Sequence, residues 1–166
     1  MKYSIWAVPP EPVFSKLKKI ITEVSERYDS PIMEPHITIA GNIEEDLNFI
    51  EDISKKLISS KKEFKVSLGE VSFSTTYFQS VFVRVRSQAS LMQLNMDLKE
   101  AFGLDNDVFM PHMSLFYGDH DMDTREKIAK EISSLYGSFM VKEVIIVPST
   151  KNPREWEHLK TISLEN

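Results

Sequence analysis

The sequence predicts an α+β fold of two pseudo-symmetric lobes, each an antiparallel-rich sheet with helices on its outer face, with a cleft between the lobes. Segments with strand-like alternation are interspersed with segments of helical periodicity. The order helix, strand opening on Pro-His, helix and further strands occurs twice, and no linker or low-complexity segment interrupts it. We therefore expect residues 1–166 to form a single bilobal domain with a pseudo-two-fold axis.

The chain begins with a predicted strand followed by a helix. Residues 2–8, KYSIWAV, alternate and contain aromatic and β-branched residues, which is typical of a strand. Three prolines then end the strand, and Pro12 suits the first turn of a helix. The apolar residues that follow have helical spacing: Phe14, Leu17, Ile20, Ile21 and Val24.

The first Pro-His segment leads from a predicted strand into a second helix. HITIAGNI at 36–43 reads as the strand, and residues 44–59 as the helix. Acidic residues in its first turn and Lys55 and Lys56 near its last turn match the helix dipole. Its predicted apolar face consists of Leu47, Ile50, Ile53, Leu57 and Ile58.

The middle of the chain predicts two strands and a third helix. The strands are FKVSLGEVSFS at 64–74 and QSVFVRVRS at 79–87. Residues 88–102 form the predicted helix, with Gly103 as its C-terminal stop. The residues expected to point inward are Leu91, Leu94, Leu98 and Phe102.

The second Pro-His segment again begins a strand, HMSLFYG at 112–118. Residues 123–126, Asp-Thr-Arg-Glu, resemble a capping box and predict the start of a fourth helix. GSFMVKEVIIVPST at 137–150 is expected to be one strand, and HLKTISLE at 158–165 the last. The helix is expected to run through Ile128, Ile132 and Leu135.

Composition narrows the classes of function. The chain has 42% hydrophobic and 27% charged residues and no cysteine, which excludes disulfides, thiolate catalysis and Cys-based zinc sites. That composition suits a reducing compartment, and we expect a cytoplasmic location. The N-terminal segment MKYSIWAVPPEP lacks a long apolar run, so we expect no signal peptide, and no segment predicts a membrane span. The net charge of −5 argues against a stable polynucleotide complex, and we expect a monomer.

Two segments of the chain share the pattern Pro-His, apolar, hydroxyl, apolar: PHITI and PHMSL. Since side chains alternate along a strand, His36 and Thr38 should share one face, as should His112 and Ser114. The preceding prolines stiffen the backbone there. A cleft that takes one such strand from each lobe would contain two imidazoles and two hydroxyl groups.

That set of groups suits metal-free cleavage of a phosphoester. One neutral histidine takes a proton from the nucleophile, and the other, as imidazolium, protonates the leaving oxygen. The hydroxyls of Thr38 and Ser114 would donate to phosphate oxygens, where charge concentrates in the transition state. We assign His112 as the base and His36 as the acid. An active site in the cleft follows, with both histidines flanking the phosphate.

Several alternatives use the same residues. A single histidine on an apolar strand is commonly structural, but two matching units favour function. A zinc site would combine His36, His112 and His120, yet no His-x-x-x-His or cysteine pair supports it. We expect His120 to lie in a solvated turn and His158 at the surface. The acidic loop 119–123 lacks the EF-hand pattern.

The two motifs resemble those of the two-histidine phosphoesterase superfamily, which is defined by paired His-x-Thr/Ser-x motifs. HITI and HMSL fit both copies. The flanking segments YSIWAVPP, PHITIAG and PHMSLFYG resemble the cyclic nucleotide phosphodiesterases of fungi and plants. This resemblance extends over nearly the full length of the chain.

The resemblance implies a bilobal fold and metal-independent opening of a cyclic phosphate on vicinal ribose hydroxyls, without a cofactor. The partner would be a small cyclic nucleotide. Substrates of the family include nucleoside 2′,3′-cyclic phosphates and ADP-ribose 1″,2″-cyclic phosphate, a by-product of tRNA splicing. The implied catalytic residues are His36 and His112. The implied substrate-binding residues are Thr38, Ser114, Tyr117, Trp6 and Tyr77, with Phe78 as the alternative to Tyr77.

Two alternatives remain for the aromatic residues and for the reaction. Trp6 and Tyr77 could instead serve only core packing. A 2′,5′-phosphodiesterase or RNA-end-processing relative would share both motifs, although the basic residues available for polymeric RNA are few. A non-catalytic nucleotide-binding module would not need two proton-transfer groups. The basic residues in question are Arg84, Arg86, Lys151 and Arg154.

Overall fold

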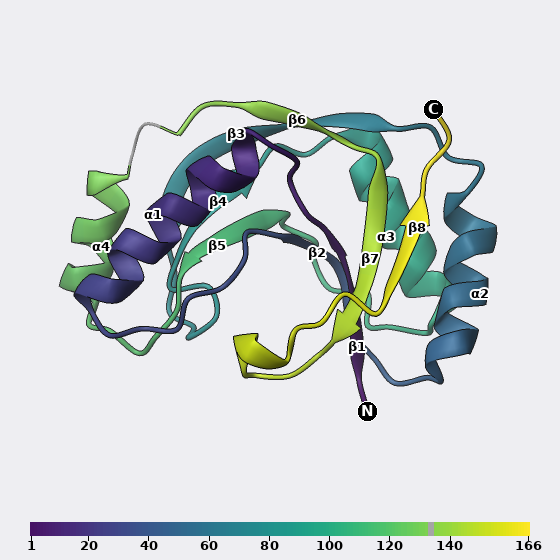
Figure 1. Ribbon diagram of the computed structural model, residues 1–166, viewed down its shortest axis with the longest axis horizontal. Coiled ribbons are helices and arrows are strands. Elements are labelled where there is room, and N and C mark those ends of the chain that lie inside the picture. Colours follow the sequence, from purple (N-terminus) through teal and green to yellow (C-terminus); the bar gives the residue numbers. More distant parts are fainter. Residues whose placement is uncertain (133–134) are drawn as a thin grey trace.

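Two four-stranded sheets organise the computed structural model, which describes residues 1–132 and 135–166 (Figure 1). The first sheet has the strand order β2-β1-β7-β8 and the second the order β5-β4-β3-β6. All neighbouring strands are antiparallel, as predicted. The strands are β1 (Tyr3–Ala7), β2 (Ile37–Ile43), β3 (Phe64–Phe73), β4 (Val81–Val85), β5 (His112–Phe116), β6 (Ser138–Val141), β7 (Glu143–Pro148) and β8 (Lys160–Ser163).

Helices cover both sheets, which confirms the predicted α+β fold of two lobes. Helices α2 and α3 pack on the first sheet, through β8 and β2, whereas α1 and α4 pack on the second, through β5, β3 and β4. Figure 1 shows the two pairs of helices at opposite ends of the molecule. The helices are α1 (Val13–Arg27), α2 (Leu47–Ile58), α3 (Ala89–Ala101) and α4 (Met122–Glu131), and one 3₁₀ turn covers Pro153–Glu155.

The two lobes are not two successive halves of the chain. Helix α1 directly precedes β2 in sequence but packs on β5, and α3 directly precedes β5 but packs on β2. The first sheet likewise joins the early strands β1 and β2 to the late strands β7 and β8. The two Pro-His strands nevertheless lie in different sheets, as the repeated order of elements predicted.

The single strand expected over 137–150 is wrong, because the structure divides it between the two sheets. β6 pairs with β3 in the second sheet, and β7 pairs with β1 and β8 in the first. Lys142 lies exposed between them. A continuous run of strand-forming residues does not reveal the point at which the chain passes from one sheet to another, because the residues on both sides of that point favour strands.

Helix α4 begins earlier than the expected capping box would place it. Asp121 is its N-cap, and its carboxylate accepts the backbone N–H of Thr124 at 2.7 Å. The box predicted at 123–126 is therefore wrong: an earlier aspartate satisfies the free N–H groups of the first turn. The helix ends at Glu131, and the continuation expected toward Leu135 crosses residues 133–134, outside the described residues.

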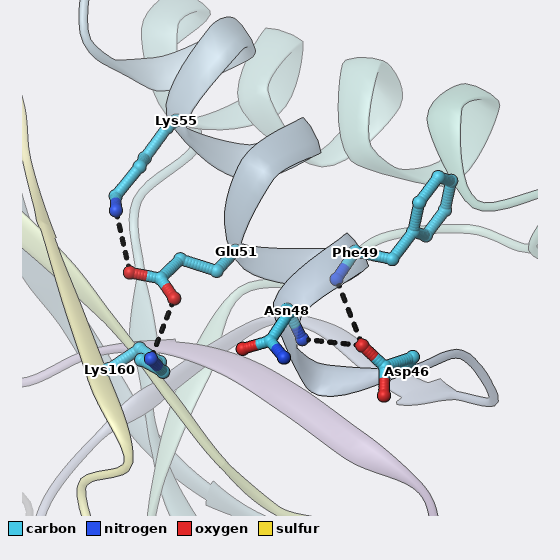
Figure 2. Close-up of polar contacts among 6 residues, drawn as sticks. All are labelled: Asp46, Asn48, Phe49, Glu51, Lys55 and Lys160. Carbon is cyan, nitrogen blue, oxygen red and sulfur yellow. Dashed lines mark hydrogen bonds and ion pairs between the residues drawn. The ribbon is translucent and has the colours of Figure 1, made fainter.

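Helix α2 is fixed at its start and tied to the first sheet by polar contacts (Figure 2). Asp46 accepts the backbone N–H groups of Asn48 and Phe49 at 2.9 and 3.3 Å, so the helix begins at Leu47 rather than at residue 44. Glu51 bonds Lys55 at 2.6 Å and Lys160 of β8 at 2.7 Å. The pair of lysines lowers the pKa of the Glu51 carboxyl.

One buried apolar cluster extends through both lobes. It includes Ile5 and Ile146 of the first sheet and Val83 and Leu115 of the second, all fully buried. The predicted end of α3 is confirmed, since Gly103 follows it with φ +59°, a conformation that favours glycine. None of the helices in the described part of the chain is long and apolar enough to cross a membrane.

Candidate active site

The first motif histidine is enclosed by two tryptophans. His36 lies directly before β2 and is only 8% exposed. Its ring stacks on Trp6 of β1, with centroids 3.6 Å apart and planes at 12°, and meets Trp156 edge-on at 5.6 Å. Its Nδ1 donates to the backbone carbonyl of Glu34 at 2.8 Å. The ring is therefore held both by stacking and by a backbone hydrogen bond.

The second motif histidine repeats the backbone contact of the first. His112 opens β5, and its Nδ1 donates to the carbonyl of Met110 at 3.0 Å, again two residues earlier and across a proline. Its ring meets Phe82 of β4 at 5.5 Å. Because a carbonyl can only accept, Nδ1 carries a proton in both histidines. Nε2 is thus the atom left for proton transfer in each ring.

The surroundings of the two rings lower both pKa values, but to different extents. Burial lowers the pKa of His36 to about 4, helped by the nearby charges of protonated His112 and His158 and opposed by the Glu34 carbonyl. For His112, burial and Arg84 lower the pKa, and the hydrogen bond to Met110 raises it.

These pKa shifts favour the opposite division of roles from the one expected from the sequence. A general base must be neutral before the reaction, and the deeply buried His36 is the ring that resists protonation most. His112 is half-buried and is the easier of the two to protonate. The environments therefore favour His36 as the base and His112 as the acid.

A cavity of about 410 Å³ opens beside His36. It contains three more of the residues predicted from the sequence: Trp6, Thr38 and Tyr117. Trp6 and Thr38 are direct partners across β1 and β2, so they share the face of the first sheet that lines the cavity. The full lining is Ser4, Trp6, His36, Thr38, Asn42, Phe78, Tyr117, Pro148, Ser149, Thr150, Lys151 and Trp156.

The hydroxyl of the second motif has a different position from that of the first. Thr38 is exposed to the cavity, whereas Ser114 is 7% exposed and is absent from its lining. The Ser114 hydroxyl donates to the backbone carbonyl of Phe78 at 2.6 Å. His112 does not line the cavity either. The histidine and the hydroxyl of the first motif thus both line the cavity, whereas the hydroxyl of the second motif is buried against a backbone carbonyl.

Tyr117 belongs to the aromatic wall of the cavity. Burial raises the pKa of its phenol, the neighbouring Ser114 lowers it, and the nearby Tyr77 raises it further. The ring meets Phe78 at 5.1 Å and Trp156 at 6.2 Å. A phenol that keeps its proton can donate to an anionic ligand, which is the role that the resemblance implied for Tyr117.

Of the two candidate aromatic residues between β3 and β4, the structure places Phe78 in the cavity lining. Phe78 is 37% exposed. Tyr77 packs instead against the main apolar cluster and against Phe78, with ring centroids 4.8 Å apart. The predicted substrate-binding position therefore fits Phe78 better than Tyr77.

Trp156 is an aromatic residue of the cavity lining that the sequence did not single out. Its indole N–H donates to the Thr150 carbonyl at 3.0 Å, which closes the loop between β7 and β8. It lies in an irregular, charged stretch without strand or helix periodicity, so no pattern connected it with the motifs. The only available signal was that it is one of two tryptophans in the chain.

Arg125 of α4 is a buried cation that orders the loop beside the cavity. It is 3% exposed and donates to the carbonyls of Ser74 and Thr76, at 2.7 and 2.9 Å, and to that of His120 at 2.8 Å. The loop 74–80 carries Phe78, whose carbonyl holds Ser114. Arg125 therefore fixes the position of the group that binds the Ser114 hydroxyl.

The two remaining histidines have structural contacts. The prediction of a solvated turn is wrong for His120, whose Nε2 bonds the Ser30 hydroxyl at 2.9 Å and whose ring stacks on Phe116 at 4.4 Å. A side chain on Gly118 would collide with this ring at its Nε2. His158 lies exposed at the surface, as predicted, and bonds Glu34 at 2.6 Å. Among the described residues, no group of three or more His, Asp or Glu could hold a metal ion.

The chain is similar in sequence to known phosphodiesterases. The chain is 26% identical to a cyclic phosphodiesterase of Arabidopsis thaliana, over 99% of this chain and 94% of that protein. It is also 26% identical to a 2′,3′-cyclic-nucleotide 3′-phosphodiesterase of Yarrowia lipolytica, over 80% of this chain and 64% of that protein.

Solved structures share the fold at lower identity. E. coli LigT, complexed with 3′-AMP, superposes with a TM-score of 0.68 at 14% identity, over 99% of this chain and 98% of that one. A protein of Thermus thermophilus gives 0.70 at 17%, with the same coverage. Residues 1–164 match the family described as cyclic phosphodiesterase-like protein. The chain therefore belongs to this family of two-histidine phosphoesterases and is a phosphodiesterase.

Proposed function

We propose that this protein opens ribose cyclic phosphates to monoesters without a metal ion, with His36 and His112 as the proton-transfer groups. The observation that carries the proposal is the matched contact of the two rings. Each Nδ1 donates to the carbonyl two residues earlier, which leaves each Nε2 for the substrate. Two histidines with the same available ring atom, one from each sheet, suit a phosphate held between them.

The reaction then proceeds as an in-line displacement. Nε2 of neutral His36 takes a proton from water, whose oxygen forms a bond to phosphorus. The bond from phosphorus to one ribose oxygen breaks, and Nε2–H of protonated His112 gives that oxygen its proton. The product is a ribose phosphomonoester, and transfer of the proton from His36 to His112 through solvent restores the starting state.

The hydroxyl groups would bind the non-bridging phosphate oxygens. Thr38 lies open to the cavity for this purpose, and Tyr117 supplies a second donor. Ser114 must release the Phe78 carbonyl before it can donate to a substrate. Trp6 and Phe78 offer aromatic faces for a base or for the ribose.

More specifically, we propose ADP-ribose 1″,2″-cyclic phosphate as the substrate. The enzyme would then act in the metabolism of tRNA-splicing products. Support for this choice comes from the family resemblance of the two motifs. The relative from Yarrowia lipolytica is named for 2′,3′-cyclic nucleotides, which form the second substrate class to test. That residues 1–166 act as one monomeric domain in the cytoplasm stays a prediction; the continuous apolar cluster supports the single domain.

A panel of phosphodiesters tests the proposal directly. The protein is incubated with cyclic phosphates and with a 2′,5′-linked dinucleotide, each with and without EDTA, and products are identified by phosphorus NMR. We expect a cyclic phosphate to yield a single monoester at an undiminished rate in EDTA. Loss of activity in EDTA, or cleavage of the 2′,5′ linkage alone, would contradict the proposal. Binding of cyclic phosphates without turnover would point to the nucleotide-binding module.

A further inference from the structure

The residue two positions before each motif histidine holds the ring through its backbone and is itself held through its side chain. The carbonyls of Glu34 and Met110 accept Nδ1 of His36 and of His112, at 2.8 and 3.0 Å. A displacement of either carbonyl would therefore turn the ring that it holds. The proposed reaction uses neither of the two side chains, so their contacts are free to serve the position of the rings.

Glu34 is held by a histidine from the far end of the chain. Nε2 of His158 lies 2.6 Å from the Glu34 carboxylate, and Nε2 is the donor because a carboxylate only accepts. The two residues are 124 positions apart in the sequence. The side chain of Glu34 is 21% exposed and that of His158 is 43% exposed, so neighbouring residues cover most of the carboxylate end of the contact. The contact joins the segment before β2 to the segment before β8.

The segment that carries Glu34 has no regular secondary structure, since residues 30–36 form neither helix nor strand. Met33 and Pro35, on either side of Glu34, are buried, and Lys18 donates to the Met33 carbonyl at 3.2 Å. The segment should therefore stay packed without the Glu34 side chain. Burial of two apolar neighbours does not set the direction of the carbonyl between them, which leaves that task to the contact with His158.

The segment that carries His158 has a fixed backbone. The Leu159 N–H donates to the Ile146 carbonyl of β7 at 2.9 Å. Trp156, two residues before His158, meets the ring of His36 edge-on at 5.6 Å. Residues 156–158 therefore contact the His36 ring directly through the tryptophan, and they contact the residue whose carbonyl holds this ring through the histidine.

The second motif has a corresponding contact. Nη1 of Arg84 donates to the Met110 sulfur at 2.7 Å. Arg84 is also the partner of His112 in the register of β4 and β5. In both motifs, a side chain from outside the motif thus contacts the residue whose carbonyl accepts Nδ1. Because sulfur is a weak acceptor and a carboxylate a strong one, the contact of Glu34 is the better able to fix its carbonyl.

We propose that His158 is a positioning residue of this enzyme, which holds His36 in its productive orientation through Glu34. The inference rests on the proposed role of His36 in proton transfer. His158 donates to the Glu34 carboxylate, and the Glu34 carbonyl accepts Nδ1 of His36, which leaves Nε2 for the substrate. Loss of this contact should lower kcat more than it changes KM, because it orients a proton-transfer group and touches no substrate atom.

Steady-state kinetics with a cyclic phosphate that the enzyme hydrolyses provide the first test. His158→Phe keeps a planar ring without a donor and should lower kcat about 3- to 10-fold, with a change in KM of less than about twofold. His158→Gln keeps an N–H donor and should retain more than about half of the wild-type kcat. Glu34→Ala should resemble His158→Phe, and the double variant should lose no more activity than either single variant.

The control is a surface ion pair away from the site. Arg27 bonds Glu131 at 2.9 Å, and the exposed fractions of the two side chains, 50% and 37%, are similar to those of the proposed pair. Arg27→Gln should leave kcat unchanged, since loss of an exposed ion pair has little effect in itself. Melting temperatures of all variants show whether a lower kcat accompanies a loss of stability.

NMR of the His36 ring separates failure of this inference from failure of the proposed function. The Nδ1 proton is protected from exchange with water while it bonds the Glu34 carbonyl, and its exchange rate is measured in the protein without substrate. We expect several-fold faster exchange in His158→Phe and a rate close to that of the wild type in His158→Gln and Arg27→Gln. This result would support the positioning role even if His36→Ala kept full activity, an outcome that would contradict the proposed function alone.

Several results would each overturn the inference. One is an unchanged exchange rate in His158→Phe, and another is an unchanged kcat of this variant in an enzyme that His36→Ala inactivates. A His158→Gln protein as impaired as His158→Phe would show that the hydrogen bond to Glu34 is not what matters. Additive losses in the double variant, or an equal loss in Arg27→Gln, would show that His158 does not act through Glu34.

Discussion

The two Pro-His strands are nearly identical in sequence pattern but differ in their surroundings. β2 places its histidine between two tryptophans and its hydroxyl, Thr38, open to a cavity. β5 places its histidine beside Phe82 and Arg84, with its hydroxyl, Ser114, bound to a backbone carbonyl. The repeated motif therefore fixes the backbone contact of each ring, while its neighbours decide the proton affinity and the availability of the hydroxyl.

The largest loss of activity should follow replacement of either motif histidine, and the two variants should differ in their response to a better leaving group. We expect His36→Ala and His112→Ala each to lower kcat roughly 100- to 10,000-fold, the usual contribution of a general acid or base. With a nitrophenyl ester as substrate, whose leaving group needs no proton, His112→Ala should regain activity and His36→Ala should not. Rescue of His36→Ala instead would restore the order of roles expected from the sequence.

Removal of the two motif hydroxyls should have different effects: loss of the Thr38 hydroxyl should lower kcat alone, and loss of the Ser114 hydroxyl should also lower stability. Thr38→Ala should lower kcat roughly 10- to 1,000-fold with an unchanged melting temperature, because it removes a donor to the phosphate from an exposed position. Ser114→Ala should also lower the free energy of unfolding, by about 1–3 kcal/mol, since the Phe78 carbonyl loses its buried partner. Kinetics and thermal unfolding of both variants measure this, with Thr38→Ser as the control that keeps the donor. A stable Ser114→Ala protein would show that the contact contributes little.

Arg125 should affect the β5 side of the site and leave the β2 side alone. Arg125→Lys keeps the charge but cannot donate to three carbonyls at once, so the loop 74–80 should loosen and kcat fall several-fold through Ser114. In the double variant with Ser114→Ala, the effect on kcat should largely disappear, whereas it should persist with Thr38→Ala. Equal effects in both backgrounds would mean that Arg125 acts on the fold in general.

The smallest expected effect concerns the different pKa values of the two histidines and the change of stability with pH that follows from them. NMR should find His36 neutral down to a pH near its pKa of about 4 in the free protein. The unfolded chain takes up this proton near pH ~6.5, so it binds more protons between the two values. Stability should therefore fall as pH drops through this window, and His36→Phe should reduce the slope. A common pKa for both rings would remove the asymmetry described above.

The sequence predicted the two lobes, the order of strands and helices, and the motif residues, because each depends on local periodicity and repetition. It could not show that 137–150 divides between two sheets, since both parts consist of strand-forming residues. Nor could it show that Ser114 is covered while Thr38 is open, because a contact with the Phe78 carbonyl leaves no trace in the motif. Sequence analysis did not identify Trp156 and Arg125 for the same reason. Their roles come from contacts with backbone carbonyls, which no sequence motif records.

The exchange of elements between lobes has a consequence for synthesis of the chain. β1 is translated before both of its neighbours in the sheet, β2 and β7, and β7 follows it by more than a hundred residues. Until Glu143–Pro148 has been translated, β1 and β2 form a two-stranded pair with an open edge, which is marginally stable alone. Trp156, which encloses His36, is made later still. The nascent enzyme thus acquires its site only after Trp156 has been translated, so we expect products truncated before this residue to be inactive.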